Sequence, residues 1–193
     1  MINKSSMYKV LVLFVLTLAS VATSQAVELK KSSTVLYSDS LVLTRKMFKG
    51  KPYDKSYMIC TSFEYDYKIV RDSVFVNAFS FMKKKESRPK KNVFFEERLL
   101  QHELYHLKIT ELWARIFCAK LSGKEIKKSN LNVYLNQQYR ACNKECASMQ
   151  DLYDKETNHS KIEDKQKEWE VKIDSLLEEY KDYANRDIII KLK

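Results

Sequence analysis

The chain has 193 residues, 45% of them hydrophobic and 31% charged, with only two glycines and two prolines. This composition excludes a low-complexity chain, and the length suits one domain with a hydrophobic core rather than two ordinary ones. The formal net charge of +10 fits contact with anionic envelope surfaces and equally fits a merely soluble protein. No aromatic residues interleave with the densest basic cluster, residues 83–91, so we expect no nucleic-acid partner.

The N-terminal segment has the three parts of a secretory signal peptide. Lysines lie in its first ten residues, Val10–Val21 is an apolar run too short for a comfortable membrane span, and Ser24–Ala26 suits a signal peptidase. We predict that residues 1–26 are removed, and an uncleaved anchor is the alternative. Residues 27–193 contain no other membrane-crossing stretch and are expected to form a single domain in the periplasm or outside the cell.

The first half of the remaining chain predicts a β-sheet. Four stretches are rich in β-branched and aromatic residues, as strands are: Thr34–Tyr37, Leu41–Leu43, Tyr57–Tyr65 and Ile69–Phe81. Turns are expected at Gly50–Pro52 and Asp66–Lys68. Both faces of the last strand carry apolar residues, so we expect one face to cover helices.

In the second half, apolar residues recur at helical spacing. We expect helices over Phe95–Leu121, with a C-cap at Ser122-Gly123, over Asn130–Asp154 and over Ser160–Tyr183. Ile188–Leu192 is either a closing strand or a tail. The predicted fold class is therefore α+β, an N-terminal antiparallel sheet followed by three helices.

All four cysteines follow the predicted cleavage site. An even number in an exported chain indicates two disulfides, so Cys60, Cys118, Cys142 and Cys146 are candidates, with three pairings open. Cys142 and Cys146 lie four residues apart on one predicted helix, near the far limit for a bridge. A bridge from that helix to Cys60 or Cys118 is equally open.

His102-Glu103-Leu104-Tyr105-His106 has the H-E-x-x-H pattern of zinc metallopeptidases and lies inside the first predicted helix. Residues four apart are offset by about 40° around a helix, so both imidazoles can bind one zinc ion. Glu103 is offset by about 100°, which suits a catalytic base that takes a proton from the metal-bound water. An ordinary amphipathic helix with two incidental histidines is the alternative.

A third protein ligand has to come from elsewhere. Glu111 is a nearby carboxylate, but it lies about 180° from His102 on a continuous helix and points away. The remaining histidine, His159, lies at the break between the second and third helices, and three protein ligands plus water is the usual catalytic arrangement of zinc. Otherwise His159 is an exposed loop residue, and Asp154 either orients a ligating imidazole or is a turn residue.

Two blocks of the sequence resemble a known family. Leu99–Arg115, around the motif, is similar to the central motif of the predicted secreted zinc-dependent proteases grouped as domain of unknown function 922. Tyr153–Thr157, His159 and the later Gln166 and Trp169 are similar to that family's second motif.

The resemblance implies a role for each matching residue. The ligands of one zinc ion would be His102, His106 and His159, Glu103 would be the catalytic base, and Glu111 and Arg115 would support the helix or the ligands. The chain departs from the family at Leu104-Tyr105, where glutamine and a small residue are usual, so the bulk of Tyr105 could narrow the site.

A peptidase also needs a donor for the oxyanion of its tetrahedral intermediate. Tyr105, Tyr153 and Arg115 are candidates by residue type, although most of the 12 tyrosines are expected to be packing residues.

The sequence therefore predicts an exported zinc metallopeptidase that hydrolyses a peptide or protein substrate with a zinc-activated water and Glu103. The first alternative is a noncatalytic, zinc-stabilised binding module of the cell envelope, which the bulk of Tyr105 favours. The second is a basic envelope-associated structural protein without metal, for which a chelator would change neither stability nor activity.

Overall fold

The computed structural model describes residues 33–54, 56–92, 96–184 and 187–193. The predicted signal peptide, residues 1–26, lies outside this part of the chain. The elements that carry the predicted motif belong to the unit Val35–Lys193.

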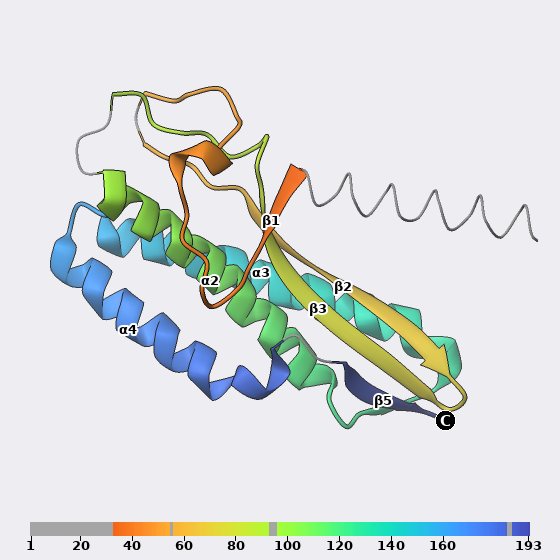
Figure 1. Ribbon diagram of the computed structural model, residues 1–193. Coiled ribbons are helices and arrows are strands. Elements are labelled where there is room, and N and C mark those ends of the chain that lie inside the picture. Colours follow the sequence, from red (N-terminus) through yellow and green to blue (C-terminus); the bar gives the residue numbers. More distant parts are fainter. Residues whose placement is uncertain (1–32, 55, 93–95, 185–186) are drawn as a thin grey trace, which may run out of the picture. The chain divides into compact units, whose positions relative to one another are not determined.

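A five-stranded sheet is built around one long antiparallel hairpin (Figure 1). The strands are β1 (Thr34–Leu36), β2 (Thr61–Val70), β3 (Ser73–Lys83), β4 (Glu125–Ile126) and β5 (Ile188–Leu192). In the hairpin, β2 pairs along one edge of β3, and β1 and β5 share the other edge of β3. β4 lies parallel to β5. Short 3-10 turns lie at Arg45–Met47, Lys128–Asn130 and Lys181–Tyr183.

The structure confirms the α+β fold class but moves several strand boundaries. Leu41–Leu43 is irregular rather than a strand, and it packs through the buried Leu43. The turn predicted at Asp66–Lys68 lies inside β2, because the alternation of tyrosine with polar residues continues through it. The hairpin turns instead at Arg71, whose φ is 54°.

Three long helices follow: α2 (Glu96–Leu121), α3 (Leu131–Thr157) and α4 (Glu163–Glu179). α2 packs against the hairpin on one side and against α3 and α4 on others, so it is the central helix (Figure 1). It ends before Gly123, as predicted, and the φ of 69° at Gly123 suits a residue without a side chain. Within the described part of the chain, none of the helices combines the length and the apolar character needed to span a bilayer.

All four cysteines are free thiols, which corrects the prediction of two disulfides. Cys118 and Cys142 are buried between the sheet, α2 and α3, whereas Cys146 is buried among side chains of α2 and α4. Cys60 is partly exposed, and its thiol lies 3.3 Å from the carboxylate of Glu86. Three of the four therefore act as small apolar core residues, a role that their even number does not reveal.

A hydrophobic cluster fixes α4 against α2 beside the predicted motif. Ile109 and Leu112 of α2 pack with Tyr153 of α3 and with Trp169 and Ile173 of α4, and all five are nearly inaccessible to solvent. Burial of each such side chain contributes about 1.5–3 kcal/mol. The cluster therefore holds the end of α3 and the start of α4 close to the histidines of α2.

Candidate metal centre

His102 and His106 lie one turn apart near the start of α2 and point to the same side. Their Nε2 atoms are 3.2 Å apart, and their rings are perpendicular, with centroids 4.8 Å apart. Both side chains are buried, with exposed fractions of 2% and 9%. The structure thus brings the two histidines together as the motif predicts.

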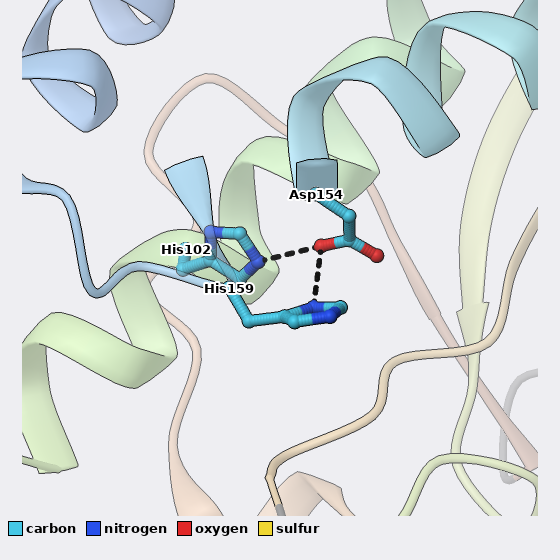
Figure 2. Close-up of side chains that lie close together, drawn as sticks. All are labelled: His102, Asp154 and His159. Carbon is cyan, nitrogen blue, oxygen red and sulfur yellow. Dashed lines mark hydrogen bonds and ion pairs between the residues drawn. The ribbon is translucent and has the colours of Figure 1, made fainter. Parts of the chain in front are cut away.

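Asp154, in the last turn of α3, faces both histidines. Its Oδ1 atom lies 3.0 Å from Nε2 of His102 and 3.0 Å from Nε2 of His106. The Nδ1 atom of His159 lies 3.1 Å from the same oxygen, and Figure 2 shows the carboxylate between His102 and His159. Three imidazoles therefore converge on one carboxylate oxygen, and His102, Asp154 and His159 together have the spacing of a metal site.

His159 reaches this point from a left-handed turn. α3 ends at Thr157, and Asn158, His159 and Ser160 follow with φ of 49°, 52° and 67°. Left-handed residues other than glycine cost about 1–2 kcal/mol each, so three in succession are unusual. Strain of this kind persists where the surrounding structure determines it, and such places are often functional sites.

Two glutamines fix the orientation of the buried histidines. Nδ1 of His102 donates to Oε1 of Gln166 at 3.0 Å, and Nδ1 of His106 donates to Oε1 of Gln150. Each amide nitrogen is engaged elsewhere: that of Gln166 donates to the Tyr153 hydroxyl, and that of Gln150 donates to the His106 carbonyl. Nδ1 of each ring therefore donates to a glutamine, and Nε2 faces Asp154, where it either donates a proton to the carboxylate or offers its lone pair to a metal.

The electrostatics of the cluster favour a positive charge at its centre. Burial opposes the charged form of His106, but its contact with Asp154 and the charge of Glu103 outweigh burial and raise its pKa. Burial also opposes the charged form of Asp154 and by itself would raise the pKa of that carboxyl. Hydrogen bonds to His102 and His106 outweigh burial and hold the pKa of Asp154 well below its usual range. A metal ion would supply the positive charge to the same lone pairs without protons.

Glu103 is buried next to the histidine pair, with an exposed fraction of 5%. Its Oε2 atom accepts the backbone N–H of Ile59 at 2.8 Å. Burial raises its pKa, and the nearby His106 and His102 oppose this in part. A buried carboxylate beside two histidines, held by a backbone N–H, has the position of a general base, and burial raises its pKa.

A groove of about 400 Å³ leads to the cluster. Residues 59–63, at the start of β2, line one side, and Asn143 and Ala147 of α3 line the other, with His106 and Asp154 also in the wall. Ligand sites commonly have volumes of about 300–1,000 Å³, so the groove can hold part of a peptide-sized ligand.

The two tyrosines predicted as oxyanion donors support the helices instead of lining this groove. The Tyr105 hydroxyl donates to Asp174 of α4 at 2.7 Å. Tyr153 stacks on the His102 ring, with centroids 4.6 Å apart, and its hydroxyl donates to the His102 carbonyl at 3.2 Å. Tyr105 therefore ties α2 to α4, whereas Tyr153 supports the position of His102.

Glu111 and Arg115 form a buried ion pair that joins three elements. Arg115 donates to Glu111 at 2.8 Å and to the Leu177 carbonyl of α4 at 2.9 Å. Glu111 also accepts the hydroxyl of Ser80 in β3 at 2.7 Å. These contacts place both residues in the core between α2, the sheet and α4, so Arg115 supports the fold rather than an oxyanion.

Gln150 is the site residue that sequence reasoning missed. It lies four residues before Asp154 in α3, so both side chains are on the face toward α2. That spacing was the available signal, but it becomes informative only when α3 is known to pack beside the motif.

Comparisons with protein-family models, with curated proteins and with solved structures found no match. The function must therefore be inferred from the residues of this chain and their geometry.

Proposed function

We propose that this protein is a zinc-dependent peptidase in which His102 and His106 hold one zinc ion and Glu103 is the general base. The observation that carries the proposal is that the Nε2 atoms of two buried histidines converge beside the buried carboxylate of Glu103. Sequence reasoning gives His159 as a further ligand, and its Nδ1 atom points toward the same cluster. The resemblance to predicted secreted zinc-dependent proteases supports the same activity.

The chain's own residues would carry the proton transfers of peptide hydrolysis. Bound zinc would polarise the substrate carbonyl and lower the pKa of its water to about 7. Glu103 would take a proton from that water and pass it to the leaving amine. Burial raises the pKa of Glu103, which favours the protonated form that donates to the leaving amine.

The substrate would be a peptide or protein that enters the groove between the start of β2 and α3. His106 and Asp154 line this groove, so a bound chain would lie beside the proposed metal ligands. The N-terminal segment predicts that hydrolysis takes place in the periplasm or outside the cell. The net charge of +10 is compatible with contact with an anionic envelope surface.

A noncatalytic zinc-stabilised module of the cell envelope is the second candidate. One observation favours it: Asp154 contacts both histidines, and His159 contacts Asp154 and lies near His102, so four protein ligands would close the site. Closed tetrahedral sites are typical of structural zinc, whereas catalytic sites keep one position for water.

The test compares the purified wild-type protein with Glu103→Gln and with Glu97→Gln, an exposed glutamate of the same helix. Zinc content is measured first, and then hydrolysis of a mixed peptide library is followed by mass spectrometry. We expect about one zinc per chain in all three proteins and a rate about 10²–10⁴-fold lower in Glu103→Gln alone. A zinc-loaded wild type without hydrolysis, or equal rates in the three proteins, would contradict the peptidase and favour the binding module.

A further inference from the structure

We infer that the carboxylate of Asp154, rather than the imidazole of His159, is the third protein ligand of the metal. The inference rests on the proposed zinc site and replaces one of its predicted ligands. Two histidines and one carboxylate would leave a fourth position open for water, which favours the peptidase over the closed binding module.

The spacing of the donor atoms favours Asp154. Nε2 of His102, Nε2 of His106 and Oδ1 of Asp154 form a nearly equilateral triangle with sides of 3.2, 3.0 and 3.0 Å. Ligands at about 2.0–2.1 Å in a tetrahedral zinc site are about 3.3–3.4 Å apart. The three atoms therefore already stand close to the spacing of one face of the coordination tetrahedron, and a small expansion would admit the ion.

His159 does not share the position that Asp154 has in that triangle. Its ring centroid is 6.5 Å from that of His102, compared with 4.8 Å between His102 and His106. Its Nδ1 atom meets the cluster at the outer side, through Oδ1 of Asp154. The side chain is also 58% exposed, whereas that of Asp154 is 32% exposed. His159 therefore lies farther from the buried pair than Asp154 does.

The backbone holds the two groups in different ways. Asp154 lies in the regular last turn of α3, which Tyr153 anchors in the core. His159 lies beyond the helix end, in the left-handed turn Asn158–Ser160. Pre-positioned ligands lose little conformational entropy on metal binding, so the helical carboxylate is the better organised of the two.

The donor chemistry agrees with this geometry. Two imidazoles and one carboxylate are a known ligand set of catalytic zinc, and the carboxylate neutralises part of the ion's charge in a buried place. His159 then acts as a positioning residue that holds the carboxylate of Asp154 from outside, as partners of metal ligands commonly do.

The experiment measures zinc affinity by competition with a chromophoric chelator at one fixed pH. The variants are Asp154→Asn, Asp154→Glu and His159→Ala, with Glu145→Gln as the control, an exposed carboxylate of α3 that does not line the groove. Loss of a residue that only orients a ligand costs about 10–100-fold in affinity. We expect Asp154→Asn to lose more than 100-fold, His159→Ala to stay within about 100-fold, and Glu145→Gln to match the wild type.

Two further measurements separate loss of a ligand from loss of the fold. Circular dichroism in excess chelator establishes that each variant is folded, and Asp154→Glu should recover part of the affinity because it restores a carboxylate. The visible spectrum of the cobalt-substituted protein should change in Asp154→Asn and persist in His159→Ala, since it reports directly on the ligands.

The opposite pattern overturns the inference. If Asp154→Asn keeps its zinc within about 100-fold while His159→Ala loses it, His159 is the third ligand and the proposed peptidase is untouched. If the affinities follow the inference but the zinc-loaded wild type hydrolyses nothing, the ligand assignment stands and the proposed function falls. A wild type that binds no zinc overturns both.

Discussion

Replacement of Gln166 by leucine should weaken zinc binding without touching a ligand. Gln166 is buried, and its Oε1 atom accepts Nδ1–H of His102 at 3.0 Å. Its Nε2 atom donates to Tyr153 at 2.7 Å and to Glu170 at 2.9 Å, so the amide cannot turn over without losing both bonds. Leucine has nearly the same volume but no acceptor, and the His102 ring would then be free to carry its proton on Nε2, where the metal must bind.

The expected loss follows from that change. Partners that fix a ligating imidazole are typically worth 10–100-fold in metal affinity, or about 1.4–2.8 kcal/mol. The Tyr153 hydroxyl and Glu170 also lose a donor, which we expect to cost about 1–3 kcal/mol of folding free energy. Affinity must therefore be measured well below the melting temperature of the variant.

Calorimetric titration of zinc into the metal-free protein supplies the affinity, and ¹⁵N chemical shifts of the histidines identify the tautomer. Gln137→Leu, at an exposed position of α3, is the control for the added apolar surface. An affinity of Gln166→Leu within twofold of the control, or a His102 tautomer that does not change, would refute the role assigned to Gln166.

The remaining predictions concern stability and the thiols. Arg115→Leu leaves its buried carboxylate partner uncompensated and should lower the free energy of unfolding in urea by about 3–5 kcal/mol. Ser160→Gly should raise it by about 1–2 kcal/mol, because φ is 67° there and the buried hydroxyl has no hydrogen-bond partner among the described residues. In thiol titration at pH 8, only Cys60 should react in the folded protein and all four thiols in urea, since burial raises the pKa of Cys118 and Cys146 to about 11. A chelator should lower the melting temperature by an amount that grows with the zinc concentration of the untreated sample, and equal melting curves would contradict a metal site.

The existence of three helices was predictable because their signals are local, although α3 runs past the predicted Asp154 to Thr157 and α4 spans Glu163–Glu179 rather than Ser160–Tyr183. The apolar spacing of α2 extends almost unbroken from its first turn to Gly123, so its boundaries differ from the expected ones by about one residue. The strands were less predictable, because an alternation of apolar and polar residues does not determine which segments pair in the sheet. Tyr57–Cys60 has the composition of a strand, yet it leaves the sheet, and its Ile59 N–H bonds to Glu103 instead.

The same distinction separates the parts of the candidate site. The placement of His102, Glu103 and His106 follows from helix geometry alone, because the two histidines lie on consecutive turns of one helix and Glu103 directly follows the first. The relation of that helix to Asp154 depends on how α3 packs across it, which no short pattern encodes. The contacts of Tyr153 with the His102 ring and carbonyl are what carry α3 to that position.

A left-handed turn after α3 then decides what the remaining histidine can do. The backbone N–H of His159 closes the helix end by donating to the Asp154 carbonyl at 3.1 Å, while its ring returns toward the Asp154 carboxylate. One residue is thus tied to Asp154 through both its backbone and its side chain. The strained turn limits how far the His159 ring could move to bind a metal ion directly. The same rigidity is useful if the ring only holds the carboxylate of Asp154 in place. The geometry of the turn therefore favours Asp154 as the group on the metal and His159 as the group behind it.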